Sequence, residues 1–145
     1  MDEKIFSKGQ HFLKTKGLNL LSVLDIDSLP IKLKEELSLA PHLNKSYSRL
    51  IMIGNGGKQF WESFKESDVS SSHPVDTFSE MLAEQFMGFF TGEPWIHKLY
   101  PPSVSVPLQK LGKWAGWSNP SLLGQDIHFE FGLWFAYRSV FITNL

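Results

Sequence analysis

The order of apolar and polar positions predicts helices and strands that alternate irregularly along the chain. Apolar residues recur at helical spacing in four stretches, at residues 3–16, 58–67, 74–92 and 107–116. Strand-like runs fall between and after them, at residues 18–26, 48–55, 95–100 and 134–143. Residues 29–39 fit a helix or a strand equally well, and both alternatives stay open.

Glycine and proline mark the expected ends of these elements. Gly17 and Gly116 follow helical stretches, and Pro74 suits the first turn of a helix. The spacing of helices and strands lacks the regular alternation of a parallel sheet. The pattern therefore predicts one α+β domain over residues 1–145, since no internal repeat and no long linker divides the chain.

Composition supports a globular chain and excludes several partners. The 145 residues are 42% hydrophobic and 20% charged, and the net charge is −1. Nucleic acid is not an expected partner, because phosphate binding needs a basic face. No apolar run reaches the roughly 20 residues of a membrane span, and the N-terminal 17 residues lack the apolar centre of a signal peptide. We therefore expect a cytoplasmic protein without a membrane partner.

The residue types that carry much enzyme chemistry are missing or scattered. The sequence has no cysteine, which excludes disulfides, thiolate zinc sites and iron–sulfur clusters held by this chain. Its five histidines form no metal-binding spacing, and no serine stands in a nucleophile elbow. No metal site is predicted, and the catalytic residues remain unknown.

The segment GNGGK, residues 54–58, lies between a predicted strand and a predicted helix. Backbone N–H groups at such a junction can hold phosphate. The glycine spacing fits neither of the two common phosphate-binding patterns. A plain turn is the favoured interpretation, with a weak anion contact as the alternative.

The segment 126–144 is the strongest candidate for a site. Asp126 could orient His128, and Gly132 would let a ligand approach the backbone closely. The alternative for His128 is a loop histidine hydrogen-bonded to backbone, and Asp126 with Glu130 could equally lie in a solvated loop. Arg138 within the aromatic strand needs either a carboxylate or an anionic part of a ligand beside it.

The pattern H-x-x-F-G-x-W-F-A-x-R at residues 128–138 resembles the signature of the cblC-type cobalamin-processing proteins, the cytosolic decyanases and dealkylases. Three further segments resemble parts of that family in the same order: KEELSLAPHL at 34–43, HPVDTFSEML at 73–82 and LQKLGKWAGW at 108–117. The cobalamin-binding N-terminal domain of epoxyqueuosine reductase is a sister resemblance.

The resemblance implies a nitroreductase-like fold, with a mainly antiparallel sheet flanked by helices, that binds cobalamin in its base-off form. Six residues are then expected to contact the cofactor: His128, Phe131, Gly132, Trp134, Phe135 and Arg138. The aromatic residues would supply packing, Gly132 close approach, and His128 and Arg138 polar contacts. The implied reaction removes the upper axial ligand, with glutathione or another external thiol, or a reductase partner, as the source of electrons.

Two other functions are alternatives, and the first of them follows from differences between this sequence and the family. Leu133 replaces the second glycine of the motif, and Phe129 replaces a proline. The chain ends at Leu145, soon after the motif, so we expect the domain to be truncated at its C-terminus relative to the family. A cofactor-free module that dimerises through an exposed final strand is one alternative. A flavin-dependent reductase, suggested by fold analogy, is the other.

Overall fold

The computed structural model describes residues 2–37, 47–101, 106–120 and 126–145. Residues 38–43 of the segment KEELSLAPHL lie outside this part of the chain. The helices are α1 (Glu3–Thr15), α2 (Ile31–Glu36), α3 (Gln59–Glu66), α4 (Pro74–Met87) and α5 (Leu108–Ala115), with a short 3-10 helix η1 (Ile26–Ser28). The strands are β1 (Leu20–Asp25), β2 (Arg49–Gly56), β3 (Ile96–Tyr100), β4 (Asn119–Pro120), β5 (Asp126–Ile127) and β6 (Phe135–Thr143).

The described residues build a four-stranded antiparallel sheet in the order β1-β2-β6-β3. The last strand in the sequence, β6, lies inside this sheet, where Ile142 is paired with Leu50 on one side and with His97 on the other. The expectation of an exposed final strand that mediates dimerisation is therefore wrong. The reason is that β2 and β6 carry the most continuous apolar runs, which suit the centre of a sheet buried on both faces.

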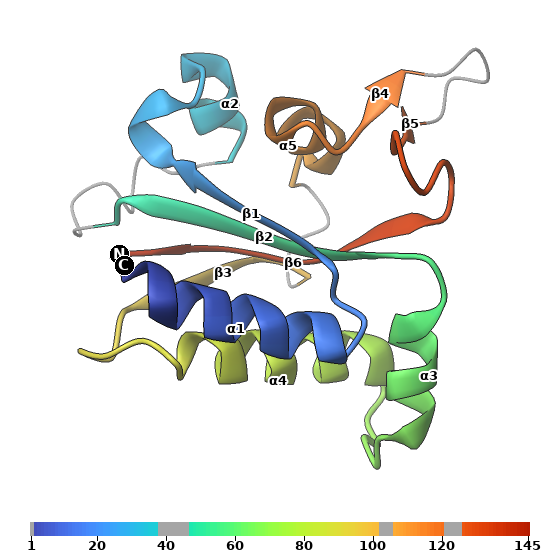
Figure 1. The fold of residues 1–145 in the computed structure, drawn as a ribbon. Coiled ribbons are helices and arrows are strands. Elements are labelled where there is room, and N and C mark those ends of the chain that lie inside the picture. The colour runs from blue at the N-terminus through green and yellow to red at the C-terminus, as the bar shows by residue number, and fades with distance from the viewer. Residues whose placement is uncertain (1, 38–46, 102–105, 121–125) are drawn as a thin grey trace.

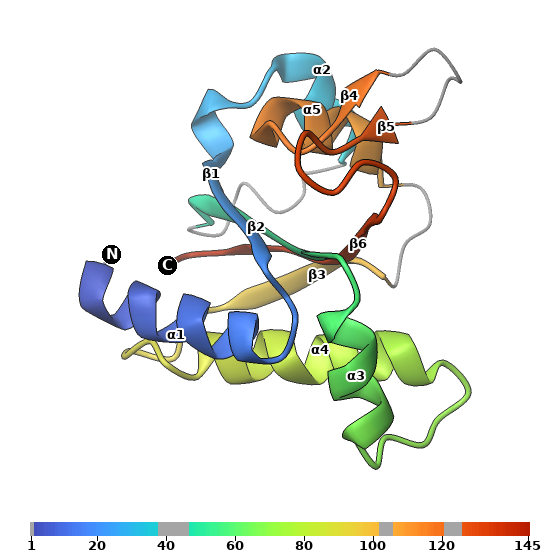
Figure 2. The ribbon, with the colours of Figure 1, turned by 45° about the vertical axis from the view of Figure 1, so that its right-hand side comes forward.

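Helices cover both faces of the sheet, so the domain has three layers (Figure 1). Helices α1, α3 and α4 lie on one face and enclose a core that includes Ile51, Phe86 and Phe141. Helices α2 and α5 lie on the other face, over a second core that includes Leu50 and Val140. The turned view shows the same separation (Figure 2). We call these the lower and the upper face, as the figures are oriented.

The structure confirms an α+β domain with an antiparallel sheet between helices. Residues 29–39, which fitted a helix or a strand equally well, contain α2, a helix of six residues. Helix α4 ends at Met87 rather than extending to residue 92, and its C-cap is Gly88, a residue type of low helix propensity. No helix in the described part of the chain is long and apolar enough to span a bilayer.

Candidate functional site

The motif forms a tight loop that leads into β6. We call residues 128–134 the motif loop. His128 and Gly132 exchange two backbone hydrogen bonds, each with a donor–acceptor distance of 2.8 Å, and the Trp134 N–H donates to Phe131 O at 2.9 Å. Gly132 has a φ of +59°, in the left-handed region that glycine adopts without strain. The loop backbone is therefore fixed by its own hydrogen bonds.

His128 holds this loop from inside. Only 4% of its surface is exposed, and its Nδ1 accepts hydrogen bonds from the backbone N–H groups of Glu130 at 3.0 Å and Phe131 at 3.3 Å. Burial lowers the pKa of His128 below its ordinary value, and the charge of Glu130 opposes this shift. The geometry is that of a neutral loop histidine bonded to backbone, the second of the two alternatives raised by the sequence.

Three aromatic rings surround the imidazole of His128. The ring centroids lie 4.8 Å from Phe129, 5.1 Å from Phe131 and 5.6 Å from Phe135. Nδ1 is used by the backbone, so it is not free to bind a metal ion. The Phe129 ring, which stacks on the imidazole, joins the buried His128 to the exposed side of the loop.

The outer surface of the motif loop is apolar and open. Phe129 is 81% exposed, Trp134 is 74% exposed and Leu133 is 52% exposed. A Cβ placed on Gly132 would meet no atom within 4 Å. Large apolar side chains grouped on a fixed loop are typical of a binding surface. Trp134 and Gly132 were predicted site residues, whereas Phe129 and Leu133 were noted only as departures from the family pattern.

The glycine-rich segment 54–57 anchors the motif loop. A Cβ on Gly56 would lie 2.0 Å from Cδ2 of Phe131, so the Phe131 ring packs directly on the glycine backbone. The N–H of Gly57 donates to Trp134 O at 2.9 Å, and the N–H of Gly56 donates to Asn19 Oδ1 at 2.8 Å. These two N–H groups already have partners, so the structure favours the turn interpretation over an anion site.

A stacked aromatic pair continues the upper face next to the loop. Trp117 and Tyr137 stack at 5.8 Å with an interplanar angle of 17°, and Phe135 contacts Tyr137 edge-on at 5.6 Å. Gly112 leaves room for the Tyr137 hydroxyl, since a Cβ there would lie 1.9 Å from it. Trp117 and Tyr137 were not among the predicted site residues. The alternation of side chains along β6, counted from Phe135, would have indicated Tyr137.

Arg138 lies on the lower face, away from Phe135. Its Nε donates to Asn55 Oδ1 at 2.7 Å, and its guanidinium carbon lies 4.7 Å from the Phe60 ring centroid and 5.1 Å from that of Trp61. Burial lowers the pKa of Arg138 from its ordinary value, while Tyr100 and Asp76 act in the opposite direction. An amide and two rings thus contact the guanidinium directly, and the carboxylate of Asp76 acts on its charge through electrostatics.

Five of the six predicted site residues therefore lie in or next to the motif loop, and the sixth, Arg138, lies apart from them. The structure brings His128, Phe131 and Phe135 into contact, with Gly132 and Trp134 on the same loop. Arg138 is on the other side of the sheet. Glu130 is exposed, as expected of a solvated loop, and the Asp126 side chain lies outside the described residues. No group of three metal-binding side chains occurs among the residues described.

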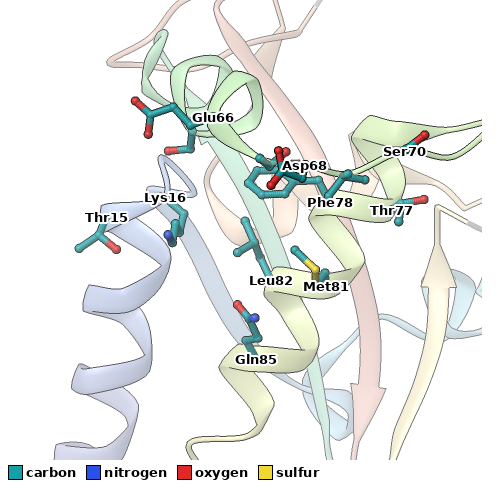
Figure 3. A pocket seen from close by; sticks show the side chains of 13 residues that line it. Thr15, Lys16, Glu66, Asp68, Ser70, Thr77, Phe78, Met81, Leu82 and Gln85 are labelled. Atoms are coloured by element: carbon teal, nitrogen blue, oxygen red, sulfur yellow. The ribbon is translucent and has the colours of Figure 1, made fainter.

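A hollow lined by described residues lies elsewhere, between the end of α1, the α3–α4 connection and α4. Its volume is about 790 Å³. Figure 3 shows Lys16, which follows α1, facing Leu82 and Gln85 of α4, with Asp68 and Phe78 at one end. None of its lining residues belongs to the motif loop.

Comparison with protein-family models and with curated proteins gives no match for this chain.

Proposed function

We propose that this chain is a cobalamin-binding domain with a nitroreductase-like fold, related to the cblC-type proteins. The observation that carries the proposal is the motif loop, which holds Phe129, Leu133 and Trp134 exposed on a backbone fixed by hydrogen bonds. The residues fit the cofactor, because a corrin is broad, apolar on its faces and lined with amides at its rim. The open backbone at Gly132 suits close approach.

The exposed rings can contribute substantial binding free energy. An aromatic side chain buries about 150–250 Å² when fully covered. Covering half of Phe129 and Trp134 would contribute about 4 kcal/mol at about 25 cal/mol per Å². The loop loses little entropy on binding, because its backbone is already fixed.

We assign different roles to the predicted residues. Trp134 and Gly132 would contact the ligand, together with Phe129 and Leu133. Phe131 and Phe135 would support the loop from below, and His128 would position it. A direct contact between His128 or Arg138 and cobalamin stays a prediction.

If the domain is catalytic, it removes the upper axial ligand of cobalamin. The bound cofactor supplies that chemistry, with electrons from an external thiol such as glutathione or from a reductase partner. The residues of this chain would hold the cofactor base-off and exclude water from it with their apolar surface. We propose a cytoplasmic location, where reduced thiols are present.

Titration of the purified protein with cyanocobalamin tests binding directly. We expect a base-off visible spectrum, and we expect Trp134→Ala to weaken the affinity about tenfold or more, as loss of an aromatic contact of about 1.4 kcal/mol would. Trp95→Ala is the matched control, because Trp95 is also exposed, at 56%, but precedes β3. An unchanged spectrum at saturating protein, or equal effects of the two substitutions, would reject the proposal. Flavin absorbance of the protein as purified would instead favour a flavin-dependent reductase.

A further inference from the structure

In the part of the chain that the structure describes, the sheet has two edges, β1 and β3, and they differ in how they are protected. On β3, Lys98 bonds to Glu84 at 2.8 Å and lies 3.5 Å from Glu80, and the register shifts between Lys98 and Tyr100. The hydrogen bond with Glu84 raises the pKa of Lys98, so this charge persists. A lysine and a bulge are features that discourage strand pairing at an edge.

Strand β1 has neither feature. Its sequence is LLSVLD, with one charge at the last residue and no proline, and its register with β2 is continuous from Leu20 to Asp25. Among the described residues, β2 is the one strand paired with it. In both views β1 forms the margin of the sheet, between α1 and α2 (Figures 1 and 2). An apolar, regular edge of this kind is a site for pairing with another strand.

The hydrogen-bond pattern identifies which backbone groups point outward from β1. The N–H of Ile26 donates to Ser48 O at 3.0 Å, which makes Ile26 and Ser48 a hydrogen-bonded pair next to β1. Such pairs alternate with non-bonded pairs in an antiparallel ladder. Leu24, Ser22 and Leu20 therefore bond to β2. The N–H and C=O groups of Leu21, Val23 and Asp25 point away from the sheet.

The side chains of β1 are also incompletely covered. Residues 21–24 are each half-buried, whereas residues 50–56 of the neighbouring β2 are fully buried. Leu24 packs on the upper core, and Leu21 and Val23 pack on the lower core. A strand that completes this edge must therefore be apolar on both faces. Strand β1 itself offers Leu21 and Val23 on one face and Leu20 and Leu24 on the other, with Ser22 and Asp25 as its polar residues.

We propose that two copies of this chain pair through β1, antiparallel and about a two-fold axis at Val23. Val23 then lies opposite Val23 of the second copy, and Leu21 lies opposite Asp25 of the second copy. In this register all outward groups of Leu21, Val23 and Asp25 fall in hydrogen-bonded pairs, each exchanging two bonds.

Charge does not oppose this arrangement. The two Asp25 carboxylates lie at opposite ends of the paired strands, so like charges do not meet. The net charge of −1 gives little repulsion between copies. The two four-stranded sheets would join into one continuous sheet, with both cores extended across the axis.

A single introduced cysteine tests the register, because the natural sequence has none. Directly opposed residues in a hydrogen-bonded pair have Cα atoms about 5.5 Å apart, which lies within the range of a disulfide. We expect Val23→Cys to form a disulfide-linked dimer in a glutathione redox buffer. Ile96→Cys, on the other edge, is the matched control and should form no disulfide-linked dimer, although it can still pair through β1. Crosslinking of Ile96→Cys but not of Val23→Cys would overturn the proposal.

Light scattering over a concentration series tests the association without a crosslink. The mass should rise from 16.6 kDa towards twice that value as the concentration increases. Val23→Pro should abolish the rise, because it removes an outward N–H and no bond to β2, whereas Val23→Ala should retain it. If Val23→Pro does not fold, Ser22→Lys supplies the blocking charge instead. A constant monomer mass at every concentration, or a dimer that persists in the folded blocking variant, would overturn the proposal.

Discussion

At His128, hydrogen bonding and protonation compete for the same nitrogen. Nδ1 accepts two backbone hydrogen bonds, and a proton there would turn this acceptor into a donor and break both. Burial is the main reason that the pKa is lowered, and Glu130 opposes it only in part. The neutral ring therefore holds the motif loop, and the contribution of His128 to the stability of the fold depends on pH.

We expect acid to destabilise the protein through His128. The unfolded chain takes up this proton at about pH 6.5 and the folded chain only at lower pH. The stabilisation is complete above about pH 6.5 and is lost as the pH falls through that value towards the folded-state pKa. Urea denaturation gives the free energy of unfolding at about pH 7.5 and about pH 5. This free energy should fall less between the two pH values for His128→Asn than for the natural protein, since an asparagine oxygen accepts backbone N–H bonds without titrating. The exposed His73 is the control, and His73→Asn should leave the loss unchanged.

The contact between Gly56 of β2 and Phe131 of the motif loop links two elements that are distant in sequence. We expect Gly56→Ala to lower the free energy of unfolding by about 1–3 kcal/mol, because its Cβ would overlap the Phe131 ring. The double variant Gly56→Ala with Phe131→Ala should lose less than the sum of the two single variants.

Chemical denaturation of the four proteins measures this cycle. Gly88→Ala is the control, since Gly88 has a φ of −64° and the nearest atom to its added Cβ would be Gln85 O at 3.2 Å, not a ring carbon at 2.0 Å. Strict additivity would mean that the ring and the glycine do not constrain each other.

Elements with strong local signals could be predicted from the sequence, but their pairing could not. Gly17 and Gly116 have positive φ values at helix ends, and Pro74 opens α4, as local chemistry requires. The interior position of β6 depends on pairing with β2 and β3, which are distant in sequence. Arg138 shows the consequence: its type suggested a site residue, while strand alternation places it on the face opposite Phe135.

At the scale of the whole molecule, the order of the sheet predicts an order of local stability. Strands β2 and β6 are paired on both sides and lie between two cores, whereas β1 and β3 each have one strand neighbour among the described residues. Amides of central strands open only with global unfolding, and edge strands open more readily. We therefore expect the slowest hydrogen exchange at Leu50–Ile53 and Val140–Ile142.

Exchange measured residue by residue by NMR also separates the monomer from the paired form. The outward amides of Leu21 and Val23 should exchange fast in dilute protein and slow down as concentration rises, because pairing through β1 would cover them. The amides of Ser22 and Leu24 bond to β2 in either state and should change little. Protection of Leu21 and Val23 that is already high and independent of concentration would mean that this edge is covered within one chain. Slow exchange in β3 together with fast exchange in β6 would contradict the sheet order itself.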